Sequence, residues 1–106
     1  LGCDVSMELR PGYPPTLNHE SDALFARDII TDMLGADGLE TDITPVMGAE
    51  DFSFMLEKKP GAYVWLGAGL QSENLHSPHF DFNDDLLPIG ASFWVQLAQS
   101  KLTQST

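Results

Sequence analysis

Alternating and continuous runs of apolar residues predict three β-strands in this chain. Apolar and polar positions alternate over residues 3–9, as in a strand with one face buried. Thr and Ile residues favour a second, weaker strand over 39–46. The unbroken apolar run 62–68 is typical of a strand buried on both faces.

Three other segments have helical patterns. Residues 18–34 repeat apolar side chains every three or four positions, with Asn18 or Ser21 as the predicted N-cap and Gly35 as the predicted end. A short helix is predicted over 50–57, and a last one from residue 83 or 84 to about 102, with a buried face made of Ile89, Phe93, Trp94, Leu97 and Ala98. Strands and helices in this order predict the α/β class, as a partial layered sheet with flanking helices.

Three prolines between Pro11 and Pro15 interrupt this pattern and predict a boundary at residue 16. Residues 1–16 are then one unit and residues 17–106 another. The chain begins on Leu1 and passes at once into the alternating pattern, so we expect a segment of a longer polypeptide.

The amino-acid composition limits the binding partners and the cellular location that we expect for this protein. The 16 acidic and 5 basic residues give a net charge of −11, which argues against binding to nucleic acid or to an anionic membrane. No apolar run reaches the roughly 18 to 20 residues of a membrane span, and the first residues lack a signal-peptide pattern. The one cysteine, Cys3, excludes an internal disulfide; it falls on the apolar face of the first strand and is expected to be a core thiol in a cytoplasmic protein.

Two stretches carry candidate chemistry. The long polar stretch 69–83 contains His76 and His79, and imidazole is a common zinc ligand. Their spacing leaves open whether they bind a metal or merely belong to a polar loop. Glu50 and Asp51 begin the short predicted helix, where two carboxylates could bind a cation, act in acid–base catalysis, or simply favour the helix start.

Several motifs occur in the order found in one known family: MGAEDFSF at 47–54, PGAY at 60–63, LHSPHF at 75–80 and LPIGA at 87–91. The chain resembles the C-terminal part of the aminoacylase/hippurate hydrolase family of two-metal, metallopeptidase-like amidohydrolases. The resemblance implies that residues 17–106 are the C-terminal segment of a zinc-peptidase-like catalytic domain. Residues 1–16 would be the strand and linker that return from a lid (dimerisation) domain.

The family resemblance also implies an activity, which is hydrolysis of the amide bond of hippurate-like N-acyl amino acids. This reaction would require two divalent metal ions, zinc, manganese or similar, as cofactors. His76 matches a metal-ligating histidine, whereas His79 is not counted as a ligand, and Glu50 and Asp51 match a segment that supports the active site.

The family's other ligands and its general base come from an N-terminal region, so no catalytic residue is assigned in this chain. We therefore expect the isolated segment to be an inactive monomer, and the whole enzyme to be a homodimer through its lid domain. Two alternatives stay open: an acidic, non-catalytic protein-interaction domain, and a carboxypeptidase or deacetylase of the same family.

Overall fold

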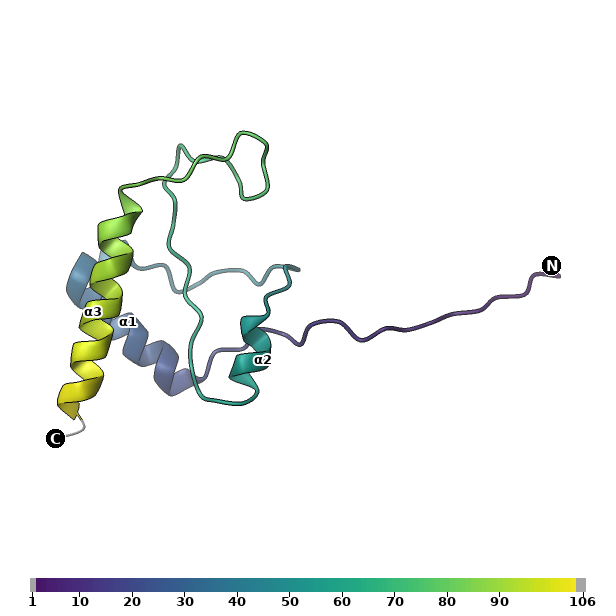
Figure 1. Cartoon of the computed structure of the whole chain (residues 1–106), viewed down its shortest axis with the longest axis horizontal. Coiled ribbons are helices and arrows are strands. Elements are labelled where there is room, and N and C mark those ends of the chain that lie inside the picture. Colours follow the sequence, from purple (N-terminus) through teal and green to yellow (C-terminus); the bar gives the residue numbers. More distant parts are fainter. Residues whose placement is uncertain (1, 105–106) are drawn as a thin grey trace.

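The computed structural model describes residues 2–104, and within them the regular structure is helical (Figure 1). The elements are α1 (Glu20–Leu34), a 3₁₀ turn η1 (Ala36–Gly38), α2 (Phe52–Leu56) and α3 (Leu86–Gln104). The three predicted helices are thereby confirmed, with ends that differ by a few residues.

None of the helices described here combines the length and apolar character that a membrane crossing requires.

Helix α1 begins and ends on local backbone signals. Its N-cap is His19, whose carbonyl oxygen accepts the N–H groups of Asp22 (3.1 Å) and Ala23 (2.9 Å). Gly35 ends the helix as predicted, with φ 76° and its N–H donated to the carbonyl of Thr31. The predicted N-caps Asn18 and Ser21 do not cap the helix.

Helices α1 and α3 pack against each other (Figure 1). Ala26 and Ile29 of α1 are buried. The Lys101 ammonium of α3 lies 4.2 Å from the centroid of the Phe25 ring, a cation–π contact between the two helices. The predicted inner face of α3 is partly wrong: Ile89, Phe93 and Leu97 are half-buried, but Ala98 is exposed and Trp94 is 65% exposed.

The predicted α/β class is wrong for the part of the chain that the structure describes, since residues 2–104 contain no strand. Residues 3–9 extend away from the helices with both faces in solvent, and 39–46 form an irregular connection (Figure 1). In the run 62–68, Val64, Trp65 and Leu66 are exposed rather than buried. A strand is stable only beside a hydrogen-bonded neighbour, and these three segments do not pair with one another.

The molecule is elongated and exposes an unusually large surface. Its radius of gyration is 18.7 Å, compared with about 13 Å for a folded domain of 100 residues. Its accessible surface is 9421 Å², whereas a folded monomer of this mass exposes about 5,800 Å². The extended N-terminal segment contributes to both values, and many large apolar side chains elsewhere are also exposed (Figure 1).

Candidate functional site

Glu50 lies at the start of α2, and both of its carboxylate oxygens accept hydrogen bonds. The Phe52 N–H donates to Oε1 at 3.2 Å, and the Tyr63 hydroxyl donates to Oε2 at 3.0 Å. The Glu50 carbonyl accepts the Ser53 hydroxyl at 2.6 Å, and Ser53 is 1% exposed. The buried serine therefore fixes the Glu50 backbone, while the two other donors orient its carboxylate.

These contacts favour the ionised form of the Glu50 carboxylate. The Phe52 N–H has the largest effect in lowering the pKa of Glu50, followed by the neighbouring Asp51 carboxyl and the Tyr63 hydroxyl. The same carboxylate raises the pKa of the Tyr63 phenol, first because it accepts a hydrogen bond from the protonated phenol, and also because loss of the phenol proton would place two negative charges side by side. Glu50 is therefore an anion, and Tyr63 a neutral hydrogen-bond donor, at neutral pH.

Tyr63 is held in place by Asn18, which sequence analysis considered only as a helix cap. The Tyr63 N–H donates to Asn18 Oδ1 at 2.8 Å, and Asn18 Nδ2 donates to the Tyr63 carbonyl at 2.9 Å. The adjacent His19 N–H donates to the Gly61 carbonyl at 3.0 Å, and His19 Nδ1 accepts the Gly61 N–H at 3.3 Å. Four hydrogen bonds thus join residues 18–19 to residues 61–63.

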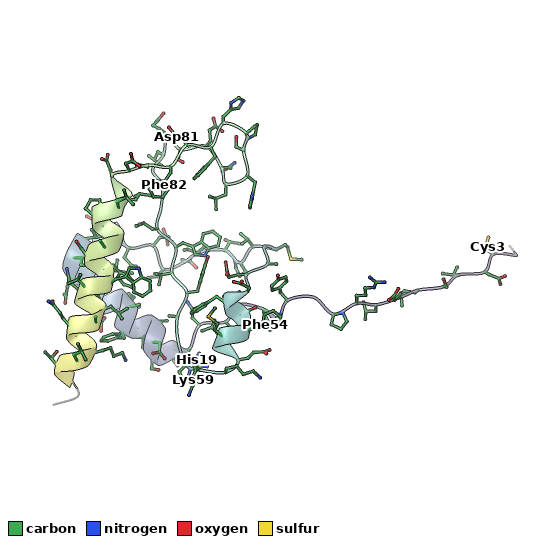
Figure 2. The ribbon with its side chains drawn as sticks, in the orientation of Figure 1. Cys3, His19, Phe54, Lys59, Asp81 and Phe82 are labelled. Carbon is green, nitrogen blue, oxygen red and sulfur yellow. The ribbon has the colours of Figure 1, made fainter. Side chains whose placement is uncertain are left out.

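Figure 2 shows His19 beside the turn that carries Lys59 and leads into Gly61. Residues 18 and 63 are 45 positions apart, so no local pattern pairs them. The available signal is that Tyr63 lies in the PGAY motif at 60–63. That motif does not indicate that Tyr63 meets Asn18.

His76, the predicted metal ligand, lies in an exposed loop built from consecutive turns. Its φ of 69° is in the left-handed region, which is uncommon for a residue other than glycine. Ser77 donates its N–H to the Asn74 carbonyl at 3.0 Å, and its own hydroxyl accepts the His79 N–H at 3.2 Å. These bonds support the unusual backbone conformation of His76, which is the kind of feature that accompanies binding sites.

Asn83 closes the base of this loop. Its side-chain amide donates to the Ala68 carbonyl at 3.2 Å, and its side-chain oxygen accepts the Asp85 N–H at 3.1 Å. The same residue thus connects the end of the 62–68 run to the start of α3. The loop that holds His76 is therefore anchored at its base, although its tip extends into solvent (Figure 1).

The described residues do not by themselves fit a complete metal site. Between residues 2 and 104, no three or more His, Cys, Asp or Glu side chains gather so as to hold a metal ion. The histidine loop and the start of α2 lie in different parts of the molecule (Figure 1). The assignments of His76 as a ligand and of Glu50 and Asp51 as supporting residues therefore stay predictions, since one imidazole is too few ligands for a zinc-type site.

Cys3 differs from its predicted role. The sequence pattern predicts a thiol in the apolar core, but Cys3 is exposed and lies near the far end of the extended N-terminal segment (Figure 2). The apolar side chains that follow Cys3 on the same face, Val5, Met7 and Leu9, are likewise exposed.

Comparison with known proteins gives several related hydrolases. The chain is 38% identical over 100 residues to the IAA-amino acid hydrolase ILR1-like 5 of Arabidopsis thaliana, covering 91% of this chain and 23% of that protein. It is 37% identical over 90 residues to an N-acetyldiaminopimelate deacetylase of Streptococcus suis (83% and 23%). It is 35% identical over 88 residues to the hippurate hydrolase of Campylobacter jejuni (80% and 22%).

The chain spans about a quarter of the length of these relatives. No solved structure matches it significantly. Residues 3–100 match the family described as peptidase family M20/M25/M40. Because this match covers almost the whole chain, the protein belongs to peptidase family M20/M25/M40.

Proposed function

We propose that this chain is part of a metal-dependent amidohydrolase that hydrolyses the amide bond of N-acyl amino acids. The observation that carries the proposal is the family match over residues 3–100. The names of three relatives support the substrate class, because an IAA-amino acid, hippurate and N-acetyldiaminopimelate each carry an acyl group on the nitrogen of an amino acid. Cleavage of that amide is the reaction that they have in common.

We assign His76 as this chain's ligand to one of two divalent metal ions, zinc, manganese or similar. Its motif, its exposed side chain and the left-handed backbone that presents it support the assignment. Metal ions bound in such a site would polarise the substrate carbonyl and activate a water molecule. The remaining ligands would come from outside the residues described here, and Glu50 and Asp51 would support the site electrostatically.

The test uses the full-length protein that contains this chain, with hippurate and N-acetyl amino acids as substrates. We expect His76→Ala to lose one metal equivalent and about a hundredfold or more in kcat/KM, because even residues that only orient ligands cost 10- to 100-fold. His79→Ala is the matched control from the same loop and should keep both metals and the normal rate. Metal content is measured by elemental analysis of the purified protein.

Retention of both metals and a normal rate by His76→Ala would refute the ligand assignment. The 106-residue chain alone should not hydrolyse these substrates, since residues 2–104 do not bring together a complete metal site. Measurable turnover by the purified chain would contradict that expectation.

A deacetylase of the same family is a second candidate, favoured by the 37% identity to the Streptococcus suis enzyme. The two candidates differ in the size of the acyl group removed. A comparison of kcat/KM for N-acetyl and N-benzoyl forms of one amino acid separates them. A preference for the acetyl form would support the deacetylase, and a preference for the benzoyl form the hippurate-like hydrolase.

A further inference from the structure

The Tyr63 hydroxyl contacts Glu50 from a distant part of the sequence. The Phe52 N–H bond is local, because Phe52 follows Glu50 by two positions in the same turn. Tyr63, 13 positions away, donates to the other carboxylate oxygen at 3.0 Å. Its ring also packs on Phe52, with the ring centroids 5.7 Å apart. Tyr63 therefore ties the orientation of the carboxylate to a segment outside α2.

Asn18 fixes the backbone of Tyr63 through a pairing that requires a primary amide. The amide oxygen accepts the Tyr63 N–H, and the amide nitrogen donates to the Tyr63 carbonyl. A neighbouring β-strand would offer the same donor and acceptor, so Asn18 stands in for such a strand at this position. Aspartate would keep the acceptor and lose the donor, and alanine would lose both.

We propose that Tyr63 is a positioning residue for the Glu50 carboxylate and that Asn18 holds Tyr63 in place for this task. The connection runs from the residues before α1, through Tyr63, to the start of α2. This inference rests on the proposed function, in which Glu50 supports the hydrolytic site. It adds Tyr63, whose hydroxyl helps to orient the Glu50 carboxylate, and Asn18, which holds Tyr63 in place.

The first test compares Tyr63→Phe with Tyr13→Phe in the full-length protein. Both substitutions remove a hydroxyl and keep the ring, and the Tyr13 ring packs on Phe54 of the same helix with centroids 5.5 Å apart. Tyr63→Phe should lower kcat roughly tenfold with KM within about twofold, because it removes a hydrogen bond to a charged group. Tyr13→Phe should stay within about twofold of the wild type in both constants.

The second test measures the contact itself in the 106-residue chain. With Tyr13→Phe in place, Tyr63 is the one remaining tyrosine, so the ultraviolet absorbance of tyrosinate reports its titration alone. Adding Glu50→Gln should move the titration midpoint to lower pH, because the neighbouring negative charge is removed. A midpoint that does not move would show that the contact is absent and would overturn the proposal.

A graded series at Asn18 tests its role in the full-length protein. The kcat value should fall from wild type to Asn18→Asp to Asn18→Ala, following the loss of one and then both hydrogen bonds to Tyr63. Combining Asn18→Ala with Tyr63→Phe should cost little more than Tyr63→Phe alone, since both act through the same hydroxyl. If the double variant lowers kcat by the product of the two separate reductions, Asn18 and Tyr63 act independently, which would contradict the proposed connection between them.

The outcomes separate this inference from the function on which it rests. If the wild-type protein binds no metal and cleaves no N-acyl amino acid, the proposed function is wrong. If the wild type is active and Tyr63→Phe matches it, or loses no more than Tyr13→Phe, the positioning role is wrong and the proposed function stands.

Discussion

Glu50 and Tyr63 depend on each other's protonation state. The pKa of Glu50 is lowered from its ordinary value of 4.5, so its contribution to stability is present above that pH and is lost as the pH falls through the lowered pKa. The pKa of Tyr63 is raised from 10.0, so its contribution is present below that pH and is lost as the pH rises through the raised pKa. The contact is therefore strongest between about pH 5 and pH 9.

This window predicts a pH-dependent difference between the wild-type chain and Tyr63→Phe. The midpoint of urea unfolding, followed by circular dichroism, should be higher for the wild type across the window. The difference should shrink toward acid, where Glu50 is protonated, and toward strong alkali, where the phenol ionises. A difference that is unchanged at acid pH would contradict the role of the Glu50 carboxylate in the contact.

The motifs predict site roles for Glu50, Asp51 and His76, but no pattern in the sequence marks Asn18 or Tyr63 as part of a site. A motif marks residues that recur together and does not report which side chains meet. The Asn18–Tyr63 pairing depends on how the chain folds between them, which neither residue type determines. Likewise, nothing in the His-Ser-Pro-His pattern indicates the positive φ of His76.

At the scale of elements, helices were predictable and strands were not. The hydrogen bonds of α1 lie within the helix, and Gly35 marks its end by a backbone conformation that other residues rarely adopt. The predicted strand 62–68 has the right composition, but its neighbour would have to come from a distant part of the sequence. In the part of the chain that the structure describes, the 62–68 run and the residues just before it are hydrogen-bonded by Asn18, His19 and Asn83 and not by a second strand.

The end of α1 provides a test at this scale. Gly35→Ala should add about 1–3 kcal/mol of backbone strain and so lower the midpoint of urea unfolding, because φ 76° with ψ 170° is strained for any residue with a Cβ atom. Helix content followed by circular dichroism during urea unfolding measures the change. Gly12→Ala is the matched control, since Gly12 has no positive φ and no neighbouring atom within 4 Å of an added Cβ. Equal effects of the two substitutions would argue against strain at Gly35.

At the scale of the whole molecule, the large exposed apolar surface lowers the stability that we expect for the isolated chain. Trp65 is 61% exposed, and Val64 and Leu66 beside it are also exposed. An accessible surface well above that of a compact monomer means that less apolar area is removed from water to offset the loss of chain entropy. Among the described apolar side chains, those that are buried are Ala26 and Ile29 of α1 and Leu56 of α2.

We therefore expect the purified 106-residue chain to bind the hydrophobic dye ANS and to unfold over a broad temperature range. Fluorescence titration and calorimetry measure these two properties. The double substitution Val64→Thr with Trp65→Gln should reduce dye binding without changing the helix content, since neither residue lies in a helix. A sharp calorimetric transition without dye binding would contradict this view of the isolated chain.

The amino-acid sequence by itself determined the three helices and the family, and it proposed Glu50, Asp51 and His76 as site residues. These follow from periodicity, end signals and motifs, which act over a few neighbouring positions. Only the tertiary structure decided that the three apolar runs do not pair as strands and that Asn18, Tyr63 and Glu50 form one connected set. Both outcomes depend on contacts between residues that are distant in sequence, and such contacts form only where the folded chain brings a hydrogen-bonding partner within reach.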